Sequence, residues 1–173
     1  MFEAHDAKTN LNRRQLLRGQ IRNQKLPMRP PWARGGNEFV QLCSRCDDCI
    51  DACEDRLLTR GSGGFPEISF LSGGCDFCGD CLTACTTGAL QAPVPAPSLA
   101  WQHRANIKAD CLSLNGIVCR ACGDACDTDA IRFQLETRGR ATPLLDQALC
   151  NGCGECLAVC PTKSISLDIP EAS

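Results

Sequence analysis

The chain has 173 residues, of which 16 are cysteine, and its formal net charge at pH 7 is only −2. This length allows one or two small domains, and modules of about 65 residues can bury only a thin hydrophobic core. We therefore expect bound metal to supply much of the stability, and the metal-free protein to be largely unfolded. No apolar run of signal-peptide length lies near the amino terminus, which argues against secretion and against insertion into a membrane.

The charges are distributed unevenly along the chain. Residues 1–36 carry eight Lys or Arg and two Asp or Glu, whereas the rest carries ten basic and eighteen acidic side chains. A basic tail on an acidic body can bind nucleic acid. No interleaving of aromatic and basic residues accompanies these charges, so we expect no nucleic-acid partner. An arm that binds a protein partner is the favoured interpretation.

The first 36 residues contain no Cys and are predicted to form this basic arm. Capping residues and apolar residues near helical spacing predict a short amphipathic helix in its first half. The prolines within residues 26–36 predict an extended segment after the helix. Trp32 in this segment either anchors it on the body or is an exposed aromatic of a disordered tail.

Arg13 and Arg14, followed by Leu-Leu-Arg at residues 16–18, look like the start of a twin-arginine export signal. Residues 19–27 are polar and charged where such a signal needs an apolar core. We therefore expect that the chain is not itself exported by this route.

The sixteen cysteines form four quartets with nearly one spacing. Three quartets read C-x2-C-x2-C-x3-C, and the third widens its first gap to seven residues. The regular spacing is the bacterial-type ligand set for a [4Fe–4S] cluster, in which the fourth Cys serves a neighbouring cluster. We expect four [4Fe–4S] clusters with these iron ligands: Cys43, Cys46, Cys49 and Cys53 in quartet 1; Cys75, Cys78, Cys81 and Cys85 in quartet 2; Cys111, Cys119, Cys122 and Cys126 in quartet 3; Cys150, Cys153, Cys156 and Cys160 in quartet 4.

Paired cysteines also occur in disulfides and in zinc sites. Structural disulfides fit a short secreted chain, and no signal peptide supports secretion here. Zinc takes two C-x2-C pairs, whereas a third Cys follows each pair here at the same interval, which one tetrahedral ion does not require. The cluster assignment is weakest for quartet 3, because the seven residues between Cys111 and Cys119 must loop out for both cysteines to reach one cluster.

The remaining pattern indicates a small, loop-rich α+β fold of tandem bacterial-type 2[4Fe–4S] ferredoxin modules. A short helix and a hairpin are expected between the quartets of each module, with turns at residues 60–64 and 137–140. The proline-rich residues 93–97 are the best module boundary. The predicted strands are residues 68–70, 131–135 and 165–169, and the predicted domains are the arm (1–36), a module with quartets 1 and 2 (37–97), and a module with quartets 3 and 4 (98–173).

Two pairings of the quartets are compatible with the spacing. In the tandem pairing, quartets 1 and 2 exchange their fourth ligands Cys53 and Cys85, and quartets 3 and 4 exchange Cys126 and Cys160. In the nested alternative, quartets 2 and 3 form a module inside one made by quartets 1 and 4. The sequence does not separate the two.

Residues for catalysis are scarce. His5 and His103 are the only histidines, and neither sits in a motif. No phosphate-binding glycine loop or dinucleotide fingerprint is present, and no Cys is left over as a nucleophile. We therefore expect that the chain is not an enzyme in its own right.

Several segments together resemble the NapF family, the accessory ferredoxins encoded with periplasmic nitrate reductases. The specific elements are the Arg-Pro-Pro-Trp tetrapeptide at residues 29–32 and the wide gap after Cys111. The resemblance also takes in Arg13-Arg14, residues 43–54, residues 60–66 and residues 149–154.

This resemblance implies a cytoplasmic protein that contacts the immature catalytic subunit of periplasmic nitrate reductase before that subunit is exported. Its implied task is to help install or reduce the partner's [4Fe–4S] cluster, with Arg13 and Arg14 contacting the partner or its handling machinery. A plain electron-transfer polyferredoxin is the alternative function, and an adaptor whose clusters only hold the fold is a third.

Overall fold

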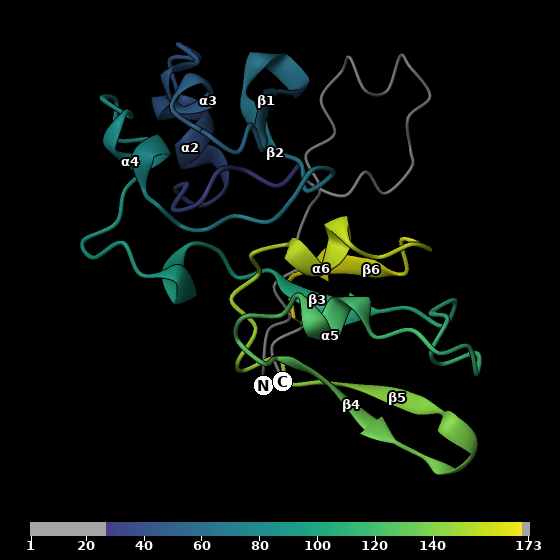
Figure 1. The fold of residues 1–173 in the computed structure, drawn as a ribbon. Coiled ribbons are helices and arrows are strands. Elements are labelled where there is room, and N and C mark those ends of the chain that lie inside the picture. The colour runs from purple at the N-terminus through teal and green to yellow at the C-terminus, as the bar shows by residue number, and fades with distance from the viewer. Residues whose placement is uncertain (1–26, 171–173) are drawn as a thin grey trace, which may run out of the picture.

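The computed structural model describes residues 27–170 of the chain. The predicted helix of the arm, with Arg13 and Arg14, lies outside the described residues. Figure 1 shows two lobes joined by a loop, each built of very short helices and two-stranded sheets. We call the lobe from α2 to α4 the first module and the lobe from β3 to β6 the second module.

The first module contains quartets 1 and 2. Its helices are α2 (Gly36–Leu42), α3 (Asp48–Asp51) and α4 (Asp80–Thr83). Its hairpin consists of β1 (Leu58–Arg60) and β2 (Pro66–Ile68), which pair antiparallel around the 3-10 turn η1 (Ser62–Gly64). The turn η2 (Pro97–Leu99) lies in the connection to the second module.

The second module contains quartets 3 and 4 and repeats this plan. Its helices are α5 (Ala121–Asp124) and α6 (Glu155–Ala158). The hairpin of β4 (Ile131–Leu135) and β5 (Ala141–Leu145) turns through η3 (Thr137–Gly139). The outer strands β3 (Arg104–Ile107) and β6 (Ile165–Asp168) pair antiparallel, with Ala105 opposite Leu167.

The same outer pairing exists in the first module in shorter form. Ala33 and Leu90 form an antiparallel bridge, flanked by hydrogen bonds from Arg34 N–H to Ala89 O (3.0 Å) and from Gln91 N–H to Trp32 O (2.9 Å). In each module, therefore, the segment before the first quartet closes on the segment after the second quartet. The sequence prediction of tandem α+β ferredoxin modules is confirmed.

Each ligand loop ends in a single helical turn. The helices α3, α4, α5 and α6 each contain the third Cys of their quartet and end two residues before the fourth. These turns point the fourth Cys away from the first three. The short helix that the sequence predicts after Cys53 is absent from the described residues, because the chain there forms a non-helical turn on its way into β1. The helical residues precede Cys53 instead.

The strand predictions are confirmed in the second module and partly wrong in the first. β4 covers the predicted residues, and β6 ends one residue earlier than predicted. The strand predicted at residues 68–70 begins earlier, at Pro66, and stops at Ile68. Phe70 leaves the hairpin and packs edge-on against Trp101, with ring centroids 6.1 Å apart.

Trp32 anchors the proline-rich segment on the first module, which decides between its two interpretations. The side chain is 3% exposed, and its Nε1–H donates to Ala96 O at 3.2 Å. Pro30 and Pro31 are fully buried beside it. Arg29 stacks over the rings of Phe39 and Phe65, 5.3 Å from each centroid. The Arg-Pro-Pro-Trp tetrapeptide is thus part of the core of this module.

Candidate iron–sulfur sites

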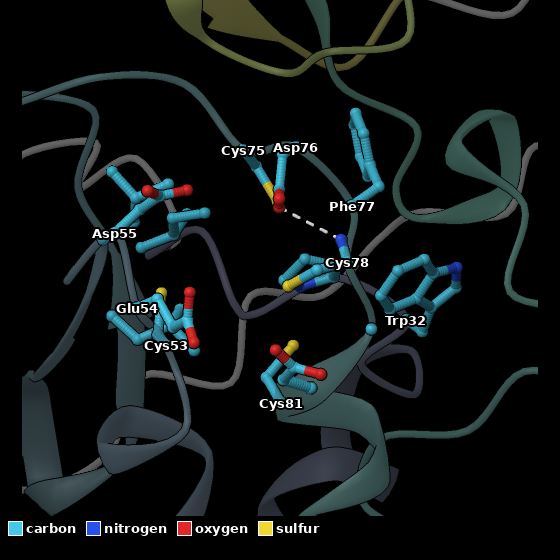
Figure 2. Close-up of a pocket in the computed structure, with 15 residues that line it drawn as sticks. Trp32, Cys53, Glu54, Asp55, Cys75, Asp76, Phe77, Cys78 and Cys81 are labelled. Atoms are coloured by element: carbon cyan, nitrogen blue, oxygen red, sulfur yellow. Dashed lines mark hydrogen bonds between the residues drawn. The ribbon is translucent and has the colours of Figure 1, made fainter.

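The first three cysteines of the second quartet and the last Cys of the first quartet surround one cavity. Figure 2 shows the side chains of Cys53, Cys75, Cys78 and Cys81 around this space, whose volume is about 70 Å³. Cys78 is held by its loop, since its N–H donates to Asp76 Oδ1 at 3.0 Å. Three thiols therefore come from one loop and the fourth from the neighbouring quartet.

The other quartets combine in the same way. Two further cavities are each lined by four cysteines, three from one loop and one from the other loop of the module. We name the four sets as follows: site 1 is Cys43, Cys46, Cys49 and Cys85; site 2 is Cys75, Cys78, Cys81 and Cys53; site 3 is Cys111, Cys119, Cys122 and Cys160; site 4 is Cys150, Cys153, Cys156 and Cys126.

Electrostatics group the thiols into the same sets. Burial, together with the neighbouring thiols of site 1, raises the pKa of Cys49 to about 11. Burial likewise raises the pKa of Cys122 to about 11, with added repulsion from Cys111, Cys119 and Cys160. Thiolates crowded in a buried space are stable only if cations neutralise them, so loading these sites with iron must displace protons.

The structure places quartets 1 and 2 in one module and quartets 3 and 4 in the other. The grouping is the tandem pairing with exchange of the fourth ligand, and the nested alternative does not occur. Within each module the two sites are close neighbours, since Cys49 of site 1 also acts on the pKa of Cys81, and Cys122 of site 3 acts on that of Cys156.

Backbone N–H groups point at several of the sulfurs. Leu90 N–H donates to Cys85 Sγ and Ser164 N–H to Cys160 Sγ, each at 3.3 Å, while Ala105 N–H donates to Cys150 Sγ at 3.4 Å. Burial raises the pKa of Cys85, but hydrogen bonds from Leu90, Thr87 and Ala89 outweigh it and bring the pKa below its ordinary value. Donors of this kind favour the thiolate form that binds iron.

Sequence reasoning missed a hydroxyl beside three of the four exchanged cysteines. Thr87, Thr128 and Thr162 each place Oγ1 within 3.6–3.8 Å of the sulfur two residues earlier. The signal was available in the sequence, since each Thr stands at the same offset from the last Cys of its quartet. Asp55 occupies this offset after Cys53.

Site 2 is the most acidic of the three sites that surround a described cavity. Its cavity is lined by four carboxylate side chains in addition to the four cysteines, and Figure 2 shows Glu54, Asp55 and Asp76 at its edge; the fourth is Asp80. The site 1 cavity has one carboxylate, Asp47, together with Arg45, and the site 4 cavity has no charged side chain among its lining residues.

The regular ligand loops share a backbone signature that the third lacks. In quartets 1, 2 and 4, the residues on either side of the second Cys have positive φ, for example Phe77 (60°) and Gly79 (86°). In quartet 3, Arg120 after the second Cys has a φ of −135°. The stretched loop therefore reaches its cavity by a different path, and five consecutive residues of it, 114–118, are exposed.

Within residues 27–170, no three Cys, His, Asp or Glu side chains converge as tightly as a single metal ion would require. Nor is any helix of that part of the chain long and apolar enough to cross a membrane.

Comparison with known proteins identifies the family. A model described as a 4Fe-4S dicluster domain matches the chain twice, at residues 42–89 and 117–164. The ferredoxin-type protein NapF of Escherichia coli strain K12 is 38% identical over 161 residues, which cover 93% of this chain and 96% of that protein. NapF of Haemophilus influenzae strain Rd is 42% identical over 171 residues, covering 92% and 94%. The chain belongs to the NapF family of ferredoxin-type proteins.

This NapF-family chain therefore carries two dicluster domains and four [4Fe–4S] clusters. The first matched segment contains all of quartets 1 and 2, whereas the second begins after Cys111 and contains the rest of quartets 3 and 4. The likeness weakens in the ferredoxin-type protein NapG of Escherichia coli strain K12, at 31% identity over 160 residues covering 82% of this chain and 69% of that protein.

The residues present fit these clusters. Each site offers four thiols, the ligand number of a [4Fe–4S] cluster. A Cβ added at Gly123, in the third ligand loop, would lie 2.8 Å from the Phe133 ring, so the close packing of this loop on the β4–β5 hairpin favours glycine. When bound, the clusters supply one-electron redox chemistry, and the surrounding N–H and hydroxyl donors set their potentials.

Proposed function

We propose that this chain is a cytoplasmic accessory protein that binds the immature catalytic subunit of a periplasmic nitrate reductase and assists its maturation before export. The assistance consists of assembling or reducing the partner's iron–sulfur cluster. One observation carries the proposal: similarity to NapF extends over 93% of the chain. The two dicluster segments alone would fit any polyferredoxin. Similarity to NapF outside these segments is specific to the NapF family, and the resemblance to that family implies this role.

In this proposal the sixteen cysteines of sites 1 to 4 are the iron ligands. Their grouping in fours, three from one loop and one from the neighbouring loop, supports the assignment. No residue is assigned a catalytic role, and the chain acts on its partner without turning over a substrate of its own.

The test uses iron isotopes. The protein is loaded with ⁵⁷Fe clusters, mixed anaerobically with cluster-free catalytic subunit, and separated from it, and ⁵⁷Fe in the subunit is measured by Mössbauer spectroscopy. Maturation by cluster assembly predicts that labelled iron appears in the subunit. Maturation by reduction predicts that a cluster supplied in natural-abundance iron is reduced while the label stays behind. Neither label nor electrons reaching the subunit would contradict the proposal.

Arg13 and Arg14 are proposed to contact the partner. The variant Arg13→Ala/Arg14→Ala should lose capture of the immature subunit, whereas the matched variant Lys8→Ala/Arg22→Ala, with the same loss of charge, should keep it. Equal capture by both variants would refute a specific role for the pair. A truncation of the amino terminus is a poorer test if it removes Arg29 or residues beyond it, because Arg29 and Trp32 pack into the first module.

Electron transfer to a redox enzyme is the second candidate function. The observation in its favour is that the two modules touch through their ligand loops, as the Cys75 N–H to Cys153 O hydrogen bond of 2.8 Å demonstrates. An accessory protein that only donated clusters would not need its two modules joined through their ligand loops.

A further inference from the structure

The two modules meet at the ligand loops of quartets 2 and 4. Cys75 N–H donates to Cys153 O at 2.8 Å, and Gly74 N–H donates to Glu155 Oε2 at 2.5 Å. Cys75 belongs to site 2 and Cys153 to site 4. A hydrogen bond thus joins two proposed iron ligands from different modules directly.

The approach of the two loops depends on glycine. A Cβ added at Gly74 would lie 2.7 Å from Glu155 N and 2.9 Å from Glu155 Cα, so no side chain fits there. Across the contact, a Cβ at Gly154 would lie 2.2 Å from the Phe70 ring. The close contact between the modules therefore requires glycine here, independently of the spacing of the cysteine ligands.

Trp101 connects the same two loops through its side chain. Its ring centroid lies 5.8 Å from that of Phe77, which stands between Cys75 and Cys78. Its Nε1–H donates at 3.0 Å to the carbonyl oxygen of Gly152, which stands between Cys150 and Cys153. The half-buried indole therefore bridges the loops of sites 2 and 4.

We propose that this junction is the path of electrons between the modules, so that the clusters are connected in the spatial order site 1, site 2, site 4, site 3. One electron leaves the reduced cluster at site 2 and enters the oxidised cluster at site 4, or the reverse, and no bond or proton changes place. A low-potential one-electron donor supplies the electron. Sites 1 and 3 are then the two ends of the array. This inference rests on the proposed cysteine ligands and deepens the electron-transfer candidate.

Two adjacent glycines provide a matched test. Gly74→Ala drives a methyl group into the Glu155 backbone, whereas a Cβ at Gly73 meets nothing closer than Glu155 Oε2 at 4.0 Å. Neither variant removes a cysteine. Each protein is purified anaerobically with its four clusters, assayed for iron and sulfide, fully reduced with dithionite and examined by electron paramagnetic resonance.

The wild-type protein and Gly73→Ala should show spin coupling that extends across the modules. Gly74→Ala should keep its iron and sulfide but lose this coupling, which narrows the spectrum of the fully reduced protein. An unchanged spectrum in Gly74→Ala, or equal narrowing in both variants, would overturn the proposal.

Trp101→Ala is the second variant, to be used whether or not Gly74→Ala assembles its clusters. It leaves the backbone of both ligand loops unaltered and should also lose the coupling between modules, while Trp101→Phe, which keeps a ring against Phe77, should retain part of it. Unchanged coupling in Trp101→Ala would contradict the proposal. The experiment contains no partner protein, so failure of the chain to bind a nitrate reductase subunit would leave its outcome unaffected.

Discussion

The side chain two residues after each exchanged Cys sets the local field at that sulfur. Thr87, Thr128 and Thr162 offer a hydroxyl to the sulfurs of sites 1, 4 and 3, whereas site 2 has Asp55 at this position. Reduction adds an electron to a cluster that is already anionic with its four thiolates. A hydroxyl donor favours the reduced form and carboxylates oppose it, so site 2 should have the lowest reduction potential of the four.

The variant Asp55→Thr should raise the lowest of the four midpoint potentials. A regained hydrogen bond is worth about 0.5–1.5 kcal/mol, or roughly 20–65 mV for a one-electron couple. Asp55→Asn removes the charge without adding a hydroxyl and should give a smaller rise. Potentiometric titration followed by electron paramagnetic resonance measures both. A shift confined to one of the three higher couples would contradict the assignment.

Trp32 is the residue whose loss should most weaken the first module. It is almost fully buried and donates a hydrogen bond to Ala96 O. Trp32→Ala should cost roughly 3–5 kcal/mol. Trp32→Phe keeps most of the apolar contact and should cost about 0.5–1.5 kcal/mol for the lost hydrogen bond, because Leu99 N–H still donates to Ala96 O at 3.0 Å. The measurement is the urea midpoint for loss of the cluster absorbance, and equal midpoints for Trp32→Ala and the wild-type protein would show that the anchor is dispensable.

Among the elements, the third ligand loop departs most from its counterparts. Its exposed residues and its different backbone path at Arg120 indicate that site 3 is less preorganised than the other sites. The loop is nevertheless held by side-chain hydrogen bonds, from Ser113 Oγ to Ala141 O and from Asn115 Nδ2 to the carbonyl oxygens of Ala109 (2.8 Å) and Cys111 (2.9 Å). A variant that tests whether the site 3 cluster is labile should therefore remove some of these hydrogen bonds.

We predict that the site 3 cluster is lost first on chelation or oxidation. Asn115→Ala should accelerate loss of the first cluster, by roughly fivefold for each hydrogen bond worth about 1 kcal/mol. Ile117→Ala, at an exposed position of the same loop, is the control and should lose iron at the wild-type rate. Iron release to a chelator, followed in time, measures both. Simultaneous loss of iron from all four sites would show that the loop confers no special lability.

The elements also indicate what sequence reasoning could and could not supply. The four ligand loops and the β4–β5 hairpin followed from cysteine spacing and from alternation of apolar residues, because both are local patterns. The position of the first hairpin was misjudged because Phe70, which looks like a strand residue, packs instead against Trp101. The Gly74–Glu155 contact joins residues 81 positions apart, and no local pattern encodes it.

For the whole molecule, the two hydrophobic clusters are small and include the cysteines themselves. Cys81 belongs to the buried core of the first module, and Cys122 and Cys156 belong to that of the second. Metal-ligand bonds therefore replace much of the apolar packing that a larger domain would have.

Removal of iron should unfold the protein. Without clusters, the crowded thiols no longer hold the ligand loops together, and the short helices are too brief to be stable alone. Far-ultraviolet circular dichroism before and after anaerobic treatment with a strong iron chelator measures this. Retention of the spectrum together with complete loss of iron would contradict a metal-dependent fold.

What the sixteen thiols bind is the central question about this protein, and one measurement answers it directly. Protein purified without oxygen is analysed for iron, zinc and acid-labile sulfide per chain. Two dicluster domains predict about sixteen iron atoms, as many sulfides, and no stoichiometric zinc. Stoichiometric zinc, or cysteines without sulfide, would contradict the account.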